Sequence, residues 1–114
     1  MINKEKKNLY EGMYILSSTL SDDARKKALD KIVVEITSQH GEIHKIHEQG
    51  RRKLAYEIDG HLEGYYYLIY FSIAPSAIEE LWKEYHLNED LVRFMTIRAE
   101  EVKETLEFKT LEEK

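Results

Sequence analysis

The sequence contains no cysteine. A disulfide framework, a thiolate zinc site and a cysteine nucleophile are therefore excluded, and the absence fits a reducing compartment. The chain also lacks an apolar run long enough to span a bilayer, and its basic start, residues 1–7, leads into no apolar signal core. We therefore expect a cytoplasmic protein that is not exported and has no membrane partner.

A recognisable catalytic constellation is also missing. The glycines form no phosphate-cradling loop, the serines have no nucleophile-elbow context, and acidic pairs such as residues 79–80 fall in segments expected to be solvated. His44 and His47 are three residues apart, and on a strand that spacing directs them to opposite faces, which disfavours a shared metal ion. We therefore expect that the protein is not an enzyme and that it binds no cofactor, metal ion or small-molecule substrate.

Charge is unevenly distributed along the 114 residues, whose length and 42% hydrophobic content suit a single core. The net charge of −5 argues, as a total, against a nucleic-acid binder. However, residues 43–58 carry four basic and two acidic side chains, whereas residues 76–90 carry one basic and five acidic ones. A basic strip therefore persists in one segment, although ordinary solvated faces would explain both patterns.

The first half of the chain predicts a strand followed by a helix. Residues 9–16 are rich in aromatic and branched side chains, which is typical of a strand. Ser21 can cap a helix that ends at His40-Gly41. Apolar side chains recur through it at helical spacing: Ala24, Ala28, Leu29, Ile32, Val33 and Ile36.

Two strands are predicted next. Residues 42–58 read as a long strand in which Gly50 indicates a bulge, and residues 59–64 supply the turn. Residues 65–73 form the most β-prone segment, apolar on both alternating faces, as suits a central strand.

A second helix and a last strand complete the pattern. Pro75 can open the helix, and residues 91–98 make a strand. One apolar stripe is expected on that helix: Ile78, Leu81, Trp82 and Tyr85.

The resulting order βαββαβ predicts an α+β ferredoxin-like sandwich, a four-stranded antiparallel sheet with two helices on one face. We expect this domain to span residues 8–100, between a flexible N-terminal extension at 1–7 and an acidic C-terminal tail at 101–114. The uncovered sheet face, if apolar, is a plausible binding surface.

One stretch offers an RNA-binding interpretation. Residues 64–70 partly match the stacking strand of an RNA recognition motif, but Glu63 replaces the basic residue and Tyr66 fills the position of a small one. A single-strand RNA binder of this kind remains an alternative. A ferredoxin-like interaction module that binds no RNA is another.

A second motif lies in the long strand: Gly50, Arg52, Leu54-Ala55-Tyr56 and Ile58. In this pattern the chain resembles the ribosomal protein six family of the bacterial small subunit. The resemblance extends from about residue 8 to about residue 100 and continues in Tyr10-Glu11, Gly64-Tyr65 and Arg93-Phe94-Met95; Asp59 departs from it, where the family often has a basic or small residue.

The resemblance implies the same fold and a structural role on the ribosome. It implies a protein that binds the central domain of the small-subunit ribosomal RNA together with ribosomal protein eighteen, as a heterodimer. Protein eighteen is generally basic, so opposite charge would steer an acidic partner to it while the pair shares the affinity for RNA.

The candidate RNA-binding residues follow from the chemistry of the motif. Arg51, Arg52 and Lys53 can bind phosphate oxygens without reading base sequence. Strand alternation puts Arg52 on the face opposite the other two, unless the bulge at Gly50 turns the backbone. Three further residues could extend the footprint: Arg93, Arg98 and Tyr10. Ordinary solubilising side chains are the alternative for the basic residues.

The acidic tail could contact the protein partner. Val102, Leu106 and Phe108 are candidate anchors on the basic protein eighteen, with the tail carboxylates left exposed. A disordered end is the alternative.

Overall fold

The computed structural model describes residues 6–58 and 61–104 of the chain. The elements follow in the predicted βαββαβ order: β1 (Asn8–Ser17), α1 (Asp22–Ser38), β2 (Glu42–Ile58), β3 (His61–Ile73), a short 3₁₀ turn (Pro75–Ala77), α2 (Ile78–Leu87) and β4 (Leu91–Arg98).

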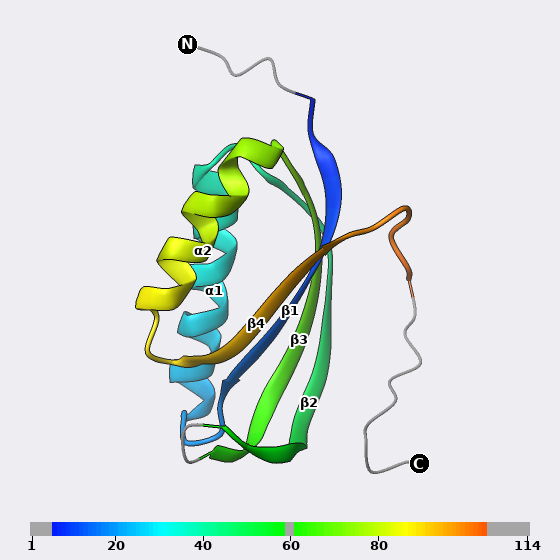
Figure 1. Cartoon of the computed structure of the whole chain (residues 1–114). Coiled ribbons are helices and arrows are strands. Elements are labelled where there is room, and N and C mark those ends of the chain that lie inside the picture. Colours follow the sequence, from blue (N-terminus) through cyan, green and yellow to red (C-terminus); the bar gives the residue numbers. More distant parts are fainter. Residues whose placement is uncertain (1–5, 59–60, 105–114) are drawn as a thin grey trace.

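The four strands form one antiparallel sheet in the order β2-β3-β1-β4. Both helices lie on one face of this sheet, and residues 99–104, which follow β4, lie on the other side (Figure 1). We call the face opposite the helices the open face. The predicted ferredoxin-like sandwich is therefore confirmed.

The first helix begins and ends where its sequence indicates. The Ser21 hydroxyl accepts a hydrogen bond from the Ala24 amide at 3.2 Å, which satisfies one of the free N–H groups at the start of α1. At the other end His40 adopts a positive φ of 66°, and the Gly41 amide donates to the Ile36 carbonyl at 2.9 Å. This left-handed turn sends the chain directly into β2.

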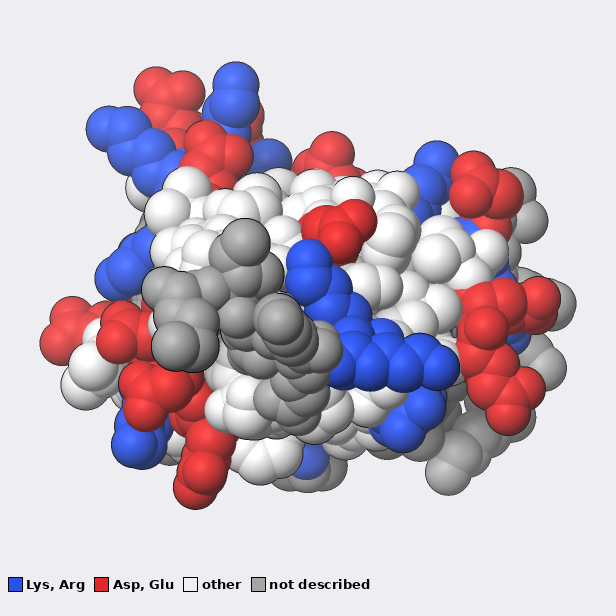
Figure 2. Space-filling view, turned by 90° about the horizontal axis from the view of Figure 1, so that it is seen from above, with Lys and Arg blue, Asp and Glu red and all other residues white. Residues whose placement is uncertain are grey.

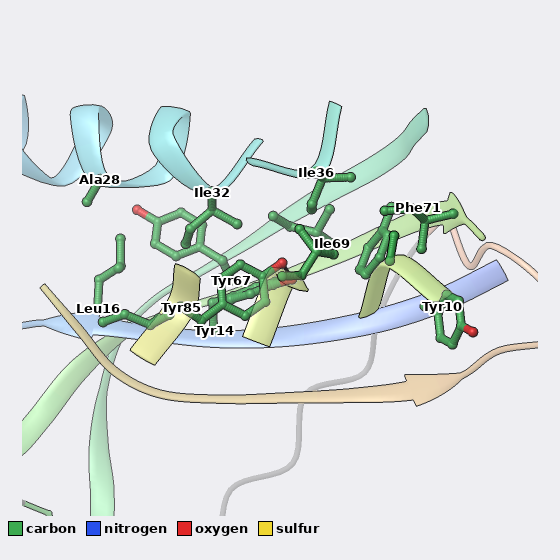
Figure 3. Close-up of a cluster of buried hydrophobic side chains, with 14 residues drawn as sticks. Tyr10, Tyr14, Leu16, Ala28, Ile32, Ile36, Tyr67, Ile69, Phe71 and Tyr85 are labelled. Carbon is green, nitrogen blue, oxygen red and sulfur yellow. Dashed lines mark hydrogen bonds between the residues drawn. The ribbon is translucent and has the colours of Figure 1, made fainter. Parts of the chain in front are cut away.

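The core lies between the helices and the sheet (Figure 3). Residues at alternating positions of β1 and β3 point to the helices and meet the buried stripe of α1. The largest fully buried side chains of this core are Tyr14, Leu16, Ile32, Ile36, Ile69, Phe71, Ile73, Leu81 and Tyr85.

Two sequence predictions need correction. The turn expected at residues 59–64 is shorter, because Ile58 pairs with His61 and β3 therefore begins at His61. Asp59-Gly60 is a sequence typical of two-residue hairpin connections.

The second correction concerns α2. Leu81 and Tyr85 are buried as expected, but Trp82 is 40% exposed. The helix sits over the β4 side of the sheet, and the Trp82 indole N–H donates to the Thr96 hydroxyl of β4 at 3.3 Å. Trp82 therefore marks the border of the core and not its centre.

Candidate nucleic-acid interface

The basic residues of the motif lie along β2, which forms one edge of the sheet. Gly50 has a φ of 79°, and the pairing of β2 with β3 shifts register between Glu48 and Gly50. The bulge predicted from Gly50 is thus confirmed, and only a glycine adopts this left-handed backbone without strain.

The bulge precedes the basic residues and does not bring them to one face. Arg51 pairs with Tyr65, Arg52 with Gly64 and Lys53 with Glu63 in an unbroken register. Because side chains opposite one another in an antiparallel pair share a face, Arg51 and Lys53 lie on the helix side and Arg52 on the open side. The three side chains therefore follow the edge of the sheet, alternately on its two sides.

Local contacts hold two of these side chains. The Arg51 guanidinium forms a salt bridge with Glu63 at 3.1 Å, and Arg52 Nε donates to the Gln49 carbonyl at 3.0 Å. Arg51 and Lys53 are exposed, and Arg52 is half-buried. We call residues 51–53 the basic strip.

Arg25 lies on the helix side of the same region, and the sequence pattern did not indicate it. Its guanidinium carbon sits 4.1 Å from the centre of the Tyr65 ring, and Tyr65 is the cross-strand neighbour of Arg51. A salt bridge to Asp22 at 3.1 Å also orients it. Only the fold reveals this neighbour, because α1 and β2 are distant in sequence.

The other two predicted arginines lie away from the basic strip. Arg93 and Arg98 are exposed residues of β4, at the opposite edge of the sheet, with β3 and β1 in between. Arg93 pairs with Ile15 and Arg98 with Tyr10. The structure therefore divides the predicted basic residues between two edges.

Tyr10 lies in the core. It is 8% exposed, and its ring stacks on Phe71 with centroids 5.8 Å apart. The strand that carries it is apolar on both alternating faces, so the sequence could not tell which face the helices cover. In this arrangement the Tyr10 ring packs inside the molecule.

The open face is partly covered by residues 99–104, a feature without a signal in the sequence pattern. His47 Nε2 is 2.7 Å from the Lys103 carbonyl oxygen, and Lys45 forms a salt bridge with Glu104 at 3.6 Å. Residues 99–104 thus reach β2, across the sheet from the strand that they follow. Val102 is half-buried within this segment, whereas Leu106 and Phe108 lie outside the described residues.

Beneath this segment lies Tyr70, which is 1% exposed. Its hydroxyl donates to a Glu11 carboxylate oxygen at 2.8 Å. Burial, followed by the hydrogen bond to the Glu11 carboxylate, raises the pKa of Tyr70 to about 12. The raised pKa keeps the phenol neutral. Because the side chain is buried, its ring is not accessible to a stacking base.

This geometry bears on the recognition-motif interpretation of residues 64–70. Tyr65 and Tyr67 point to the helices, and Tyr70 is covered. Base stacking on such a sheet requires aromatic side chains on its uncovered face. None of these three aromatic positions presents an uncovered ring there, and the half-buried aromatic residue of the open face, Tyr66, occupies the position at which the motif has a small residue.

The prediction that His44 and His47 face opposite sides is wrong. His44 Nε2 lies 2.7 Å from the hydroxyl of Ser72, an open-face residue of β3, and His47 is also on that face. The reason is a second bulge, between Ile43 and Lys45, which breaks the simple alternation. The two histidines nevertheless bind different partners, and the described residues include no group of three His, Cys, Asp or Glu able to hold a metal ion.

Figure 2 views one end of the molecule, and neither the basic nor the acidic side chains form a broad patch of one sign there. Basic and acidic side chains are interspersed there with uncharged surface.

Among the helices of residues 6–58 and 61–104, none is long and apolar enough to cross a membrane.

Comparison with known proteins is consistent across sequence and structure. A family model described as Ribosomal protein S6 matches residues 9–98. The small ribosomal subunit protein bS6 of Protochlamydia amoebophila is 66% identical, covering 98% of this chain and 98% of that protein. That of Chlamydia pneumoniae is 65% identical, covering 98% and 100%.

Solved structures show the same fold. The crystal structure of 30S ribosomal protein S6 from Thermotoga maritima is similar with a TM-score of 0.78 at 30% identity, covering 82% of this chain and 89% of that one. The C-terminal domain of the MgtC protein from Mycobacterium tuberculosis has a TM-score of 0.58 at 13% identity, covering 92% and 100%, which is a likeness of fold alone.

Proposed function

Because this chain belongs to the ribosomal protein S6 family, it is a protein of the small ribosomal subunit, and we propose that it binds the central domain of the ribosomal RNA there as a heterodimer with ribosomal protein eighteen. The role is structural and involves no reaction. Its place of action is the ribosome in the cytoplasm.

The observation that carries the RNA part of this proposal is the basic strip at the β2 edge. Arg51 and Arg52 are oriented by Glu63 and by the Gln49 carbonyl, so less side-chain freedom is lost when a phosphate binds. Arg25 can add a contact on the helix side. Phosphate contacts of this kind position a protein on RNA without reading its sequence.

The acidic total supports the dependence on a protein partner. A chain of net charge −5 with so short a basic strip gains little affinity for RNA by itself. A basic partner is attracted to the acidic surface and supplies further phosphate contacts. The segment from residue 99 onward, with Val102, Leu106 and Phe108, is our candidate for part of the protein contact.

The proposal is tested by titrating an RNA that comprises the central domain with this chain alone, with protein eighteen alone and with both together. We expect tight binding only with both. Equal affinity of the lone chain would remove the dependence on the partner.

The same titration tests the basic strip. Arg52→Ala should weaken the ternary complex by about 1–3 kcal/mol and reduce the salt dependence by about one phosphate contact. Lys27→Ala, an exposed lysine of α1, is the matched control and should leave affinity unchanged. An unaltered titration with Arg52→Ala would exclude this side chain from the interface.

A further inference from the structure

The two edges of the sheet differ in how they are protected. Natural proteins block pairing at an exposed edge with charged side chains and bulges. The β2 edge has both: its pairing with β3 shifts register at three places, and it carries charged side chains at Glu42, Lys45, Glu48, Arg51, Arg52 and Lys53. Such an edge is a poor template for another strand.

The β4 edge is much less protected. Its one register irregularity lies at its start, where Leu91 pairs with Leu16, and from Arg93 to Arg98 the pairing with β1 is regular. Only these two residues of the strand are charged. Met95 and Ile97 between them are 46% and 50% exposed. A regular, mainly apolar edge is a template for strand addition.

An aromatic groove runs beside this edge on the helix side. Its volume is about 630 Å³, and it lies between α2 and β4. Trp82, with its indole N–H on the Thr96 hydroxyl, forms part of one wall. His86 meets the ring of Phe94 edge-on, with centroids 4.9 Å apart. A strand added to β4 would place alternate side chains in this groove and the others beside Met95 on the open face.

The groove itself is lined by one basic residue, Arg93, and by no acidic one. The acidic side chains of α2 and of the turn after it flank the groove, and we take them to select the occupant. Residues 76–90 carry five acidic side chains and one lysine, and that Lys83 pairs with Glu80 at 3.2 Å. Glu79 precedes Trp82 by three residues, so the two are neighbours on the helix surface, and Glu89 follows at the end of the helix. A second copy of this chain would bring the same acidic helix to the interface, and like charges disfavour that pairing.

We propose that the β4 edge binds an extended basic segment of another protein as a fifth strand, with an apolar side chain of that segment seated between Trp82 and Phe94. This surface lies at the edge opposite the basic strip and does not depend on it. The molecule thereby offers one edge to phosphate and the other to a basic polypeptide.

Trp82 makes the test direct, because it is the only tryptophan of the chain and it lies in the groove. The probe is the capped peptide Lys-Arg-Val-Thr-Val-Thr-Val-Arg-Lys, titrated into the full-length protein at low salt. We expect a saturable change in tryptophan fluorescence that weakens as salt rises. The same peptide with methylated valine amides, or with glutamate in place of its basic residues, should bind about tenfold more weakly or worse.

Two protein variants locate the site. Met95→Lys places a charge on the edge and should weaken peptide binding about tenfold, whereas Val34→Lys, which changes a 60% exposed residue of α1, should not. If Met95→Lys does not fold, as judged by circular dichroism, the double variant Glu79→Lys with Glu89→Lys tests the charge part, with the same expected loss.

Four results would overturn the proposal. These are the absence of a saturable signal with the basic peptide, equal binding of the methylated peptide, a fluorescence change that follows dimerisation of the chain in sedimentation equilibrium, and displacement of the peptide by single-stranded RNA. The third would assign the edge to a second copy and the fourth to nucleic acid. Because the readout is at Trp82, failure here leaves the Arg52 titration unaffected.

Discussion

The hydroxyl groups of Tyr14 and Tyr85 lie 2.7 Å apart in the core, where one donates to the other. Their rings meet edge-on with centroids 5.3 Å apart, and Figure 3 shows both side chains beneath α1. Burial raises the pKa of each phenol, so both remain neutral at physiological pH. The pair joins β1 to α2 by a hydrogen bond that is protected from water.

Tyr85→Phe should lower the free energy of unfolding by about 1–3 kcal/mol, because it leaves the buried Tyr14 hydroxyl without its partner. The double variant Tyr14→Phe with Tyr85→Phe should lose less than the sum of the two single variants. Urea denaturation of the four proteins measures this coupling. Strictly additive losses would show that the hydroxyls do not depend on one another.

Glu35 of α1 is a half-buried residue whose carboxylate is turned away from solvent. Both of its carboxylate oxygens are buried without a hydrogen-bond partner among the described residues. Burial raises the pKa of Glu35, Lys31 partly opposes that rise and Glu84 adds to it. The folded chain therefore keeps a proton at pH values where the unfolded chain has released it, and the free energy of unfolding falls as pH rises through that interval.

Glu35→Gln removes this titration. Relative to the wild type, the variant should gain stability as pH rises from about 4 to about 8. Urea midpoints measured across that range provide the check, and Glu89→Gln, which alters an exposed carboxylate beyond α2, is the control. Parallel curves for wild type and Glu35→Gln would mean that the carboxylate is ionised with equal ease in both states.

At the scale of elements, the bulge at Gly50 sets the position of the basic strip. Nothing lies within 4 Å of the place that a Cβ would take at Gly50, so the only cost of a side chain there is its φ of 79°. Gly50→Ala should lower the free energy of unfolding by about 1–2 kcal/mol.

Gly50→Asn should cost less than Gly50→Ala, because asparagine tolerates the left-handed region better. Thermal or urea unfolding of both variants distinguishes backbone strain from crowding. A larger loss for the bulkier asparagine would contradict the account given for the bulge.

The sequence predicted those features of the helices and strands that depend on residues close to one another in the chain. The boundaries of α1 follow from Ser21 and His40-Gly41, which act within one turn of the helix. The predicted orientation of His44 was wrong because a bulge shifts the register between Ile43 and Lys45. No glycine stands at that point of β2, so the sequence did not indicate the bulge. The path of residues 99–104 over the sheet rests on contacts such as His47 with Lys103, which are 56 positions apart. Periodicity cannot report such contacts.

The same limit applied to the candidate site. The basic strip was visible because its three residues are consecutive, whereas its neighbour Arg25 comes from α1 and required the packing of helix on sheet. Tyr10 and Trp82 were misjudged in opposite directions. A strand apolar on both faces hides which side is covered, and a helical stripe hides where the core ends.

At the scale of the whole molecule, the sheet has two edges of different chemistry. The β2 edge carries the basic strip and bulges, and the β4 edge lies beside an acidic helix and an aromatic groove. This separation reconciles a net charge of −5 with the proposed binding to ribosomal RNA, because only one edge has to face phosphate.

The central claim is that the β2 edge faces RNA and the α2 side does not. Lys53 and Lys83 are exposed lysines of β2 and α2, so each can be replaced by a photoreactive amino acid in otherwise identical chains assembled into small subunits. The account predicts that position 53 crosslinks to the central domain of the ribosomal RNA and that position 83 crosslinks to protein or not at all. Crosslinking to RNA from position 83, with none from position 53, would contradict it.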